Sequence, residues 1–325
     1  MLVSRFLMDY SVILPSYNEA SNIGRSIDSV KIAAQKAEIA CEIIVVDNCS
    51  TDDTVCIARN HGAVVLQNTC GQRHTIAHLR NMGAAMAKGR ILAFLDSDMA
   101  VPDNWFVAAE RIFQAGFTGL MGFAETVPED AGWVAKAWGD MRFSGAAREV
   151  DFIDGRNMLI PRQLFVETGG FDDSLITCED KEFGIRVKKC GWPVLRSPEA
   201  VLIHWGYERN LLEFIKKEFW RQSSSLYMIN RLGVTLRTLR HPLLSLYHLI
   251  IPLIVIALFV NDLYWLAVCA FALWVLPSII IALNKAMTGK SNALPFWFLT
   301  FMRWNISGLA LLKQLFMGVS LVKKT

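Results

Sequence analysis

The sequence predicts an α/β domain followed by a pair of membrane helices. Short apolar runs alternate with helical stretches through the first hundred residues, which is the pattern of a strand–helix–strand chain. Two uncharged runs, 243–260 and 263–283, follow much later. The hydrophobic share of the 325 residues is 53%, which is high for a soluble protein. A soluble α/β domain joined to a membrane region accounts for this composition.

Four apolar runs in the N-terminal part have the length of buried strands. They lie at 10–16, 41–48, 63–68 and 90–98. The stretches between them, at 19–37, 51–62 and 75–89, have the pattern of helices. Because single helices join consecutive strands, we expect right-handed βαβ units and an open parallel sheet. Ligands of such sheets bind outside the carboxyl ends of the strands.

Polar side chains follow three of these strands at their carboxyl ends. They are Asn18, Glu19, Asp47, Asn48, Asp96 and Asp98. The run Asp96-Ser97-Asp98 is by itself typical of a strand-to-turn junction. Turn chemistry does not, however, predict acids from three strands at one sheet edge. This gathering favours a site that holds a divalent cation and a phosphate ester.

The two uncharged runs are each long enough to cross a bilayer core, for which about 20 residues suffice. Asn261 and Asp262 separate them, so we expect a tight helical hairpin. A buried helical pair of a soluble protein is the alternative. A third run, 294–312, contains Arg303, and because a charge inside hydrocarbon is costly we interpret this run as interfacial or re-entrant.

The segment 211–230 is amphipathic, with the pattern of a membrane-surface helix or of an ordinary half-exposed helix. With two spans, four lysines fall on the same side of the membrane as the N-terminal domain: Lys285, Lys290, Lys323 and Lys324. This bias predicts a cytoplasmic-facing domain on the inner membrane. The first residues lack a long apolar run and a cleavage site, so no signal peptide is expected.

Charge and cysteine content exclude other classes of protein. The net charge is only +3 and no basic face is apparent, so nucleic acid is not an expected partner. The seven cysteines have no metal-ligand spacing and are odd in number. Scattered cysteines of this kind indicate reduced thiols in the cytosol.

Four segments resemble, in order, the successive motifs of family 2 glycosyltransferases with the GT-A fold. They read SVILPSYNEASNI, EIIVVDNCSTDDT, LRNMGAAMAKGRILAFLDSDMAVPDNW and ETGGFDDSLITCEDKEFGIRVKKCG. The resemblance covers about residues 10–210. It implies a GT-A domain (a Rossmann-like nucleotide-diphospho-sugar transferase) at 1–210, an interface helix and linker at 211–240, and a membrane region at 241–325. The hydrophobic tail is similar to that of members that act on lipid-linked acceptors.

The resemblance also implies a UDP- or GDP-sugar donor and its contacts. The residues expected to contact this donor are Pro15, Tyr17, Glu19, Asp47, Arg73, Arg80, Asp96, Ser97 and Arg221. Asp98 is expected to bind Mn²⁺ or Mg²⁺ directly, with Asp96 and His204 as further ligands. Alternatives remain for several of them: a helix cap for Asp47, solvated surface charges for the arginines and a buried, hydrogen-bonded histidine for His204.

Transfer to a hydroxyl group also needs a base. Asp180, with Glu179 beside it, resembles the family's Glu-Asp pair at the start of an acceptor-side helix; two acids in a first helical turn also suit the helix dipole. Direct displacement with this base predicts inversion at the anomeric carbon. The residues expected to shape the sugar and acceptor pocket are Gly155, Arg156, Asn157 and Trp205.

One departure from the family limits the function. The Gln-x-x-Arg-Trp motif of processive synthases is absent, and residues 218–225 read EFWRQSSS. We therefore expect transfer of a single sugar to a lipid-linked or membrane-proximal hydroxyl group. The alternatives are a polyprenyl-phosphate glycosyl synthase, whose phosphate acceptor needs no base, and a non-catalytic, membrane-anchored protein that binds sugar nucleotides.

Overall fold

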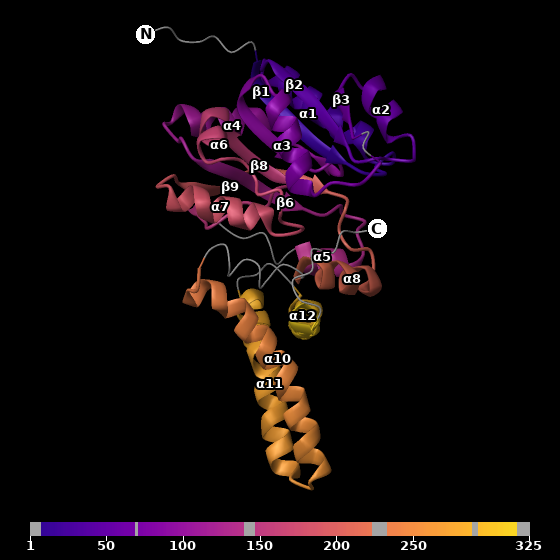
Figure 1. The fold of residues 1–325 in the computed structure, drawn as a ribbon, viewed down its shortest axis with the longest axis vertical. Coiled ribbons are helices and arrows are strands. Elements are labelled where there is room, and N and C mark those ends of the chain that lie inside the picture. The colour runs from indigo at the N-terminus through magenta and orange to yellow at the C-terminus, as the bar shows by residue number, and fades with distance from the viewer. Residues whose placement is uncertain (1–7, 69–70, 140–146, 223–232, 288–291, 317–325) are drawn as a thin grey trace. The chain divides into compact units, whose positions relative to one another are not determined.

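The computed structural model describes residues 8–68, 71–139, 147–222, 233–287 and 292–316 (Figure 1). The chain divides into two compact units. The first, here the α/β unit, contains Met1–Pro128 and Gly145–Gly206. The second, here the helical unit, contains Glu129–Ser144 and Tyr207–Lys323. The sequence pattern did not indicate that residues 129–139 belong with the C-terminal helices.

The N-terminal half of the α/β unit is the predicted parallel sheet. Its strands are β1 (Met8–Ser16), β2 (Cys41–Asp47), β3 (Val64–Gln67) and β4 (Gly89–Leu95), in the spatial order β3-β2-β1-β4. The connecting helices are α1 (Ile23–Lys36), α2 (Thr54–Asn60) and α3 (Ile76–Met86). All three strand pairs are parallel, which confirms the α/β fold class.

The sheet becomes mixed beyond β4. The further strands are β5 (Met99–Ala100), β6 (Leu120–Thr126), β7 (Arg148–Glu149), β8 (Asn157–Pro161) and β9 (Val194–His204). Strand β8 pairs antiparallel with β4 and with β6, β9 runs parallel to β6, and β5 pairs antiparallel with β9. The carboxyl end of β9 therefore comes back to the turn that follows β4.

Alternation along the strands builds two cores, one on each face of the sheet. Val12 and Leu14 of β1 face the core that contains α1 and α4 (Trp105–Gln114), whereas Ile13 faces the opposite core. That second core contains α3, α6 (Arg162–Glu167) and α7 (Glu179–Lys189). Because successive strand residues point to opposite faces, the apolar β1 run serves both layers (Figure 1).

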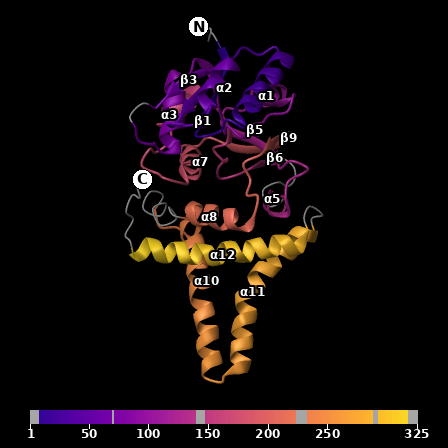
Figure 2. The ribbon, with the colours of Figure 1, turned by 90° about the vertical axis from the view of Figure 1, so that its right-hand side faces the viewer.

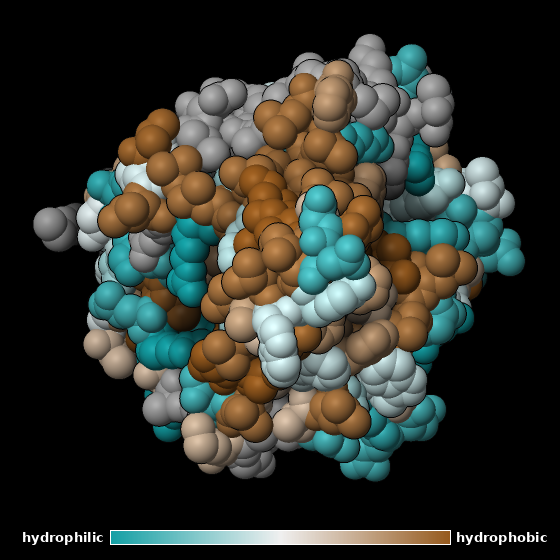
Figure 3. Space-filling model, turned by 90° about the horizontal axis from the view of Figure 1, so that it is seen from below, coloured by the Kyte–Doolittle hydropathy of each residue, from teal (hydrophilic) through white to brown (hydrophobic). Residues whose placement is uncertain are grey.

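The helical unit contains two helices long and apolar enough to cross a membrane. Its helices are α5 (Trp133–Gly139), α8 (Leu211–Arg221), α10 (Leu236–Val260), α11 (Tyr264–Met287) and α12 (Ala293–Phe316). The candidate spans are Thr238–Val260 and Tyr264–Asn284. Asp262, with φ +60°, closes the tight turn between them, as the sequence predicts. Both helices expose many large apolar side chains, and hydrophobic residues fill most of the centre of the view from below (Figure 3).

Helix α12 lies across the α10–α11 hairpin rather than along it (Figure 2). It is one continuous helix of 24 residues, so within the described residues it has no break of the kind a re-entrant segment contains. Trp297 donates a hydrogen bond to Ser278 of α11 at 3.0 Å, and the Arg303 Nε lies 3.2 Å from a Glu218 carboxylate oxygen of α8. The side chain of Lys285, and Lys290, Lys323 and Lys324, lie outside the described residues, and so does the predicted extension of α8 over 223–230.

Candidate active site

A cavity of about 230 Å³ lies at the carboxyl ends of β1, β2 and β4. Its walls consist of Pro15, Ser16, Tyr17, Glu19, Asn48, Ile76, Leu79, Asp96, Ser97 and Asp98. Six of these side chains are ones the sequence assigned to donor or metal binding. Ile76 and Leu79 were missed because the sequence shows that α3 is a helix but not which of its faces meets the cavity.

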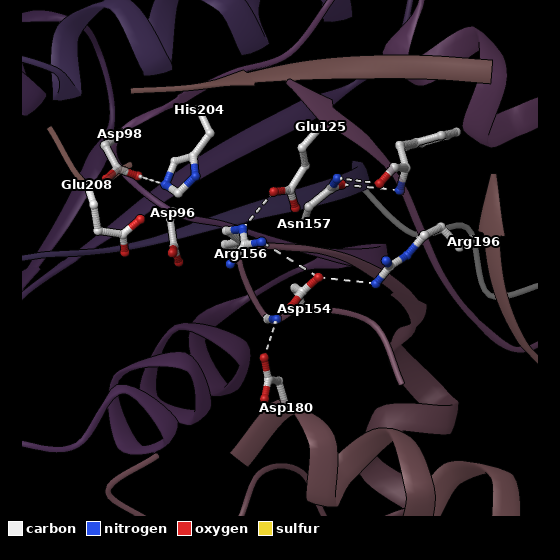
Figure 4. Close-up of polar contacts among 12 residues, drawn as sticks. Asp96, Asp98, Glu125, Asp154, Arg156, Asn157, Asp180, Arg196, His204 and Glu208 are labelled. Atoms are coloured by element: carbon white, nitrogen blue, oxygen red, sulfur yellow. Dashed lines mark hydrogen bonds and ion pairs between the residues drawn. The ribbon is translucent and has the colours of Figure 1, made fainter. Parts of the chain in front are cut away.

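Asp98 and His204 form a pair at this cavity. The His204 Nε2 lies 3.3 Å from the Asp98 Oδ1, and the side chains are 10% and 18% exposed (Figure 4). The antiparallel register of β5 with β9 matches Met99 with His204 and so brings the histidine beside the aspartate. A Cβ on Gly206 would lie 2.7 Å from the Asp98 carboxyl carbon and 3.0 Å from the His204 Nε2. Position 206 therefore needs a glycine for the backbone to pass this pair.

The donor set of this pair fits a divalent cation that also binds phosphate. Asp98 offers a carboxylate and His204 an imidazole nitrogen, and no cluster of three or more His, Cys, Asp or Glu side chains occurs among the described residues. Mg²⁺ is commonly held by one or two protein ligands, with phosphate oxygens and waters filling the other positions. Two ligands beside a cavity agree with that pattern.

Asp96 faces a different partner. Its Oδ1 accepts a hydrogen bond from the Arg80 NH2 at 3.1 Å, and its backbone N–H donates to the Arg156 carbonyl at 3.2 Å. Burial raises the pKa of Asp96, Arg80 opposes that rise, and the neighbouring Asp98 adds to it. The two acids of the Asp-Ser-Asp run therefore have different polar partners, Arg80 for Asp96 and His204 for Asp98.

Arg80 is buried rather than solvated. It is 3% exposed, and its NH1 donates to the Glu179 Oε1 at 2.6 Å. It does not line the cavity described above. The sequence placed Arg80 at the donor diphosphate; the structure places its guanidinium between two carboxylates.

Glu179 and Asp180 begin α7, directly after Cys178 in the left-handed region at φ +67°. The Asp180 Oδ2 accepts a hydrogen bond from the Gly155 N–H at 3.1 Å (Figure 4). Burial and the adjacent Asp180 raise the pKa of Glu179 to about 7, against the opposing effect of Arg80. Burial and Asp154 also raise the pKa of Asp180, while the Gly155 N–H and Arg80 lower it. Both acids are thus shifted toward neutral pH, where a base is effective.

Arg156, in the loop before β8, contacts a carboxylate that the sequence did not single out. The Arg156 Nε donates to the Glu125 Oε2 at 2.7 Å, and Glu125, on β6, is only 3% exposed (Figure 4). Asn157 is 1% exposed and donates to the Phe123 carbonyl, so it joins β8 to β6. Nothing in the pattern around Glu125 separates it from an ordinary strand residue.

Cation–π contacts occur at the rim of the site. The Arg73 guanidinium lies 4.2 Å from the centre of the Tyr17 ring, and Tyr17 is 40% exposed. The Arg25 guanidinium lies 3.4 Å from the Trp205 ring centre, a contact absent from the predicted site. Trp205 is held to the Asp98 turn because its backbone N–H donates to the Asp98 carbonyl at 2.9 Å.

Two further residues predicted to contact the donor, Asp47 and Arg221, are not among those that line the cavity. Asp47 is 2% exposed, and its Oδ2 accepts from the Ser50 N–H at 3.1 Å in the turn after β2, whereas the N-cap residue of α2 is Asp53. Its Oδ1 is buried without a hydrogen-bond partner among the described residues. Arg221 belongs to the helical unit, where it pairs with Glu208 and with Glu218.

The mixed sheet and the acids at its carboxyl edge define a GT-A-type domain, the class that acts on nucleotide-diphosphate sugars. Residues 11–166 match the model of the family described as Glycosyl transferase family 2. The chain therefore contains a family 2 glycosyltransferase domain and is a glycosyltransferase.

Relatives agree with this assignment, and a solved structure agrees with the fold. The chain is 25% identical to glycosyltransferase AglE of Haloferax volcanii over 236 residues, which cover 69% of the chain and 76% of AglE. It is 28% identical to the validoxylamine A glucosyltransferase of Streptomyces hygroscopicus over 243 residues, covering 61% of the chain and 54% of that enzyme. The fold is similar to that of the mannosyltransferase PcManGT from Pyrobaculum calidifontis, with a TM-score of 0.61, 18% identity, and coverage of 96% of this chain and 88% of that one.

Proposed function

We propose that this protein is a membrane-attached, metal-dependent, inverting glycosyltransferase. It transfers one sugar from a UDP- or GDP-sugar to a hydroxyl group of a lipid-linked or membrane-proximal acceptor. The observation that carries this proposal is the gathering of acids around one sheet edge. Asp98 pairs with His204 at the cavity, and Arg80 links Asp96 to the Glu179-Asp180 pair.

The cavity suits a nucleoside joined to a diphosphate. Pro15, Ile76 and Leu79 supply apolar walls for the nucleobase of the donor, and the half-exposed Tyr17 supplies an aromatic face. Asn48 and Glu19 supply polar groups at the same wall, as pockets for small polar ligands require. The structural neighbour PcManGT was solved with GDP-Man and Mn²⁺, which agrees with a donor of this class.

Asp98 and His204 are the residues that would hold the divalent cation. When bound, such a cation neutralises the charge that develops on a leaving diphosphate. Asp98 provides the hard oxygen ligand, and the glycine at position 206 lets the backbone pass close to both donors. Asp96, held by Arg80, is left free of that task and faces the donor from the cavity wall.

Asp180 is the proposed base. Its carboxylate accepts the proton of the acceptor hydroxyl while that oxygen attacks the anomeric carbon and the bond to the diphosphate breaks. Attack from the side opposite the leaving group inverts the anomeric configuration. The Gly155 N–H fixes one oxygen of Asp180, so the carboxylate has a defined direction.

The apolar helices indicate membrane association, and the acceptor class follows from it. The exposed apolar surface of α10 and α11 suits the hydrocarbon of a bilayer. An enzyme attached in this way meets acceptors carried on lipids. We place the α/β unit on the cytoplasmic side of the inner membrane, where nucleotide sugars are made.

The test is a donor screen with the full-length protein in detergent. UDP-glucose, UDP-N-acetylglucosamine and GDP-mannose are incubated with Mn²⁺, and release of UDP or GDP is followed. We expect one donor to be hydrolysed slowly, with the activity lost in EDTA and in Asp98→Ala. Binding or hydrolysis of none of these donors, or full activity in EDTA, would contradict the proposal. Transfer to polyprenyl phosphate alone would instead support the phosphate-acceptor alternative.

A further inference from the structure

Arg80 joins two parts of the site that are far apart in the sequence. It extends from α3, is 3% exposed, and donates one hydrogen bond to Glu179 at 2.6 Å and another to Asp96 at 3.1 Å. Asp96 directly follows β4, the donor-side strand, and Glu179 begins α7. A single rigid, planar group therefore spans the donor side and the acceptor side.

The same guanidinium packs against the loop that orients the proposed base. A Cβ on Gly155 would lie 2.7 Å from the Arg80 Cζ and 2.9 Å from its NH2, so a larger residue at position 155 would displace the guanidinium from its present position. The Gly155 N–H donates to the Asp180 Oδ2 at 3.1 Å. Arg80 thus packs against the residue whose amide holds Asp180.

The positive charge of the buried Arg80 also balances the charge of nearby acids. Three acids, Asp96, Glu179 and Asp180, lie close enough to Arg80 for its charge to act on each of them. Removing a buried cation leaves its carboxylates uncompensated, which drives them apart or protonates them. A lysine keeps the charge, but its single ammonium group has no planar fork with which to hold two carboxylates in fixed directions.

We propose that Arg80 is a positioning residue that fixes the base Asp180 relative to the donor strand. This inference rests on the proposed function and deepens it. Arg80 acts through Asp96, Glu179 and Gly155, because both terminal nitrogens are engaged and the side chain does not line the cavity. A residue with this role changes the rate of transfer, whereas a residue that binds the diphosphate changes the affinity for the donor.

The kinetic test compares Arg80→Met, Arg80→Lys and Gly155→Ala, using the donor that the screen selects. Since misplacement by about 1 Å can cost about 100-fold in rate, we expect kcat to fall by about 100-fold in Arg80→Met while the donor KM stays within about threefold. Arg80→Lys should recover part of the loss, and Gly155→Ala should resemble Arg80→Met. Arg90→Met, which removes the arginine of the Arg90–Glu110 pair at 3.0 Å, is the matched control and should retain wild-type kinetics.

A second readout does not depend on turnover. Hydrogen exchange of backbone amides in 153–157 and 177–183 should accelerate in Arg80→Met and Gly155→Ala, but not in Arg90→Met. If the wild type transfers no sugar, the proposed function fails while this measurement still decides the role of Arg80. If Arg80→Met does not fold, Arg80→Lys decides by the same kinetic split.

Two results would overturn the inference. One is a tenfold or larger rise in donor KM with kcat retained, which would indicate that Arg80 binds the donor diphosphate. The other is unchanged exchange in both segments of a folded Arg80→Met protein.

Discussion

The His204 Nε2 lies 3.3 Å from the Asp98 Oδ1, although Asp98 lies near the middle of the α/β unit's sequence and His204 near its C-terminal end. The two-residue strand β5 produces this approach, because its antiparallel pairing with β9 matches Met99 with His204. A histidine that the sequence alone could equally place in a core therefore lies beside the acid expected to bind the cation.

His204→Gln should weaken metal binding more than it weakens the fold. An amide in place of the imidazole removes a nitrogen ligand, so we expect the Mn²⁺ concentration for half-maximal activity to rise at least tenfold. The measurement is donor turnover in a Mn²⁺ titration. His61→Gln, which alters the distant pair with Asp28, is the control. An unchanged Mn²⁺ titration would show that His204 only hydrogen-bonds to Asp98.

Asp180→Asn should abolish transfer while donor binding persists. General-base catalysis contributes about 10²- to 10⁴-fold, and the amide cannot accept the proton. We expect a kcat loss in that range with little change in donor affinity, measured by calorimetry. Proton NMR of the wild-type product should show the inverted anomer. Full activity of the variant would exclude Asp180 as the base and favour a phosphate acceptor.

The raised pKa of Glu179 predicts a pH dependence of stability. Its pKa is about 7 in the folded protein and 4.5 in a model carboxyl, so between these values the folded state binds the proton and the unfolded state does not. The stabilisation is complete below about pH 4.5 and is lost as the pH rises through about 7. Between pH 5.5 and 8 the thermal midpoint of the wild type should therefore fall more than that of Glu179→Gln.

The control for this experiment is Glu167→Gln, which removes an exposed carboxylate of α6. It should follow the wild-type curve. Parallel curves for the wild type and Glu179→Gln would show that Glu179 titrates alike in the folded and unfolded states.

Arg303→Met should destabilise the helical unit. Glu218 is fully buried, and although burial would raise its pKa, Arg303 and Arg221 together lower it. Loss of one partner of a buried charge costs about 3–5 kcal/mol, and we expect the lower figure because the Arg303 side chain is 29% exposed. The measurement is the thermal midpoint in detergent. Lys313→Met, which removes a cation 5.2 Å from the Phe219 ring centre, is the control and should change the midpoint little.

The local sequence pattern was sufficient to predict the strands and helices of the first half of the α/β unit. The runs 10–16 and 41–48 became β1 and β2 within two residues at each end, because apolar strands bounded by polar turns carry their signal locally. The strands beyond β4, where the sheet is mixed, could not be predicted in the same way. The pairing of β4 with β8 and of β5 with β9 depends on contacts between distant segments.

Two arginines also differ between the sequence-based prediction and the structure. The sequence treated Arg80 and Arg221 alike, as cations that contact the donor diphosphate. Arg80 is buried between Asp96 and Glu179, whereas Arg221 pairs with Glu208 and Glu218 in the helical unit. The sequence does not show which carboxylates surround each arginine, and these surroundings are visible only in the tertiary structure.

The sequence by itself determined the fold class, the family, the apolar helical hairpin and the acids that follow the strands, because periodicity, length and short motifs are local properties. The tertiary structure alone decided which of those groups meet. It placed His204 beside Asp98, Gly155 against Arg80, and Arg303 beside Glu218. Strand register and helix packing bring these pairs together across long stretches of chain, and no local pattern records such distances.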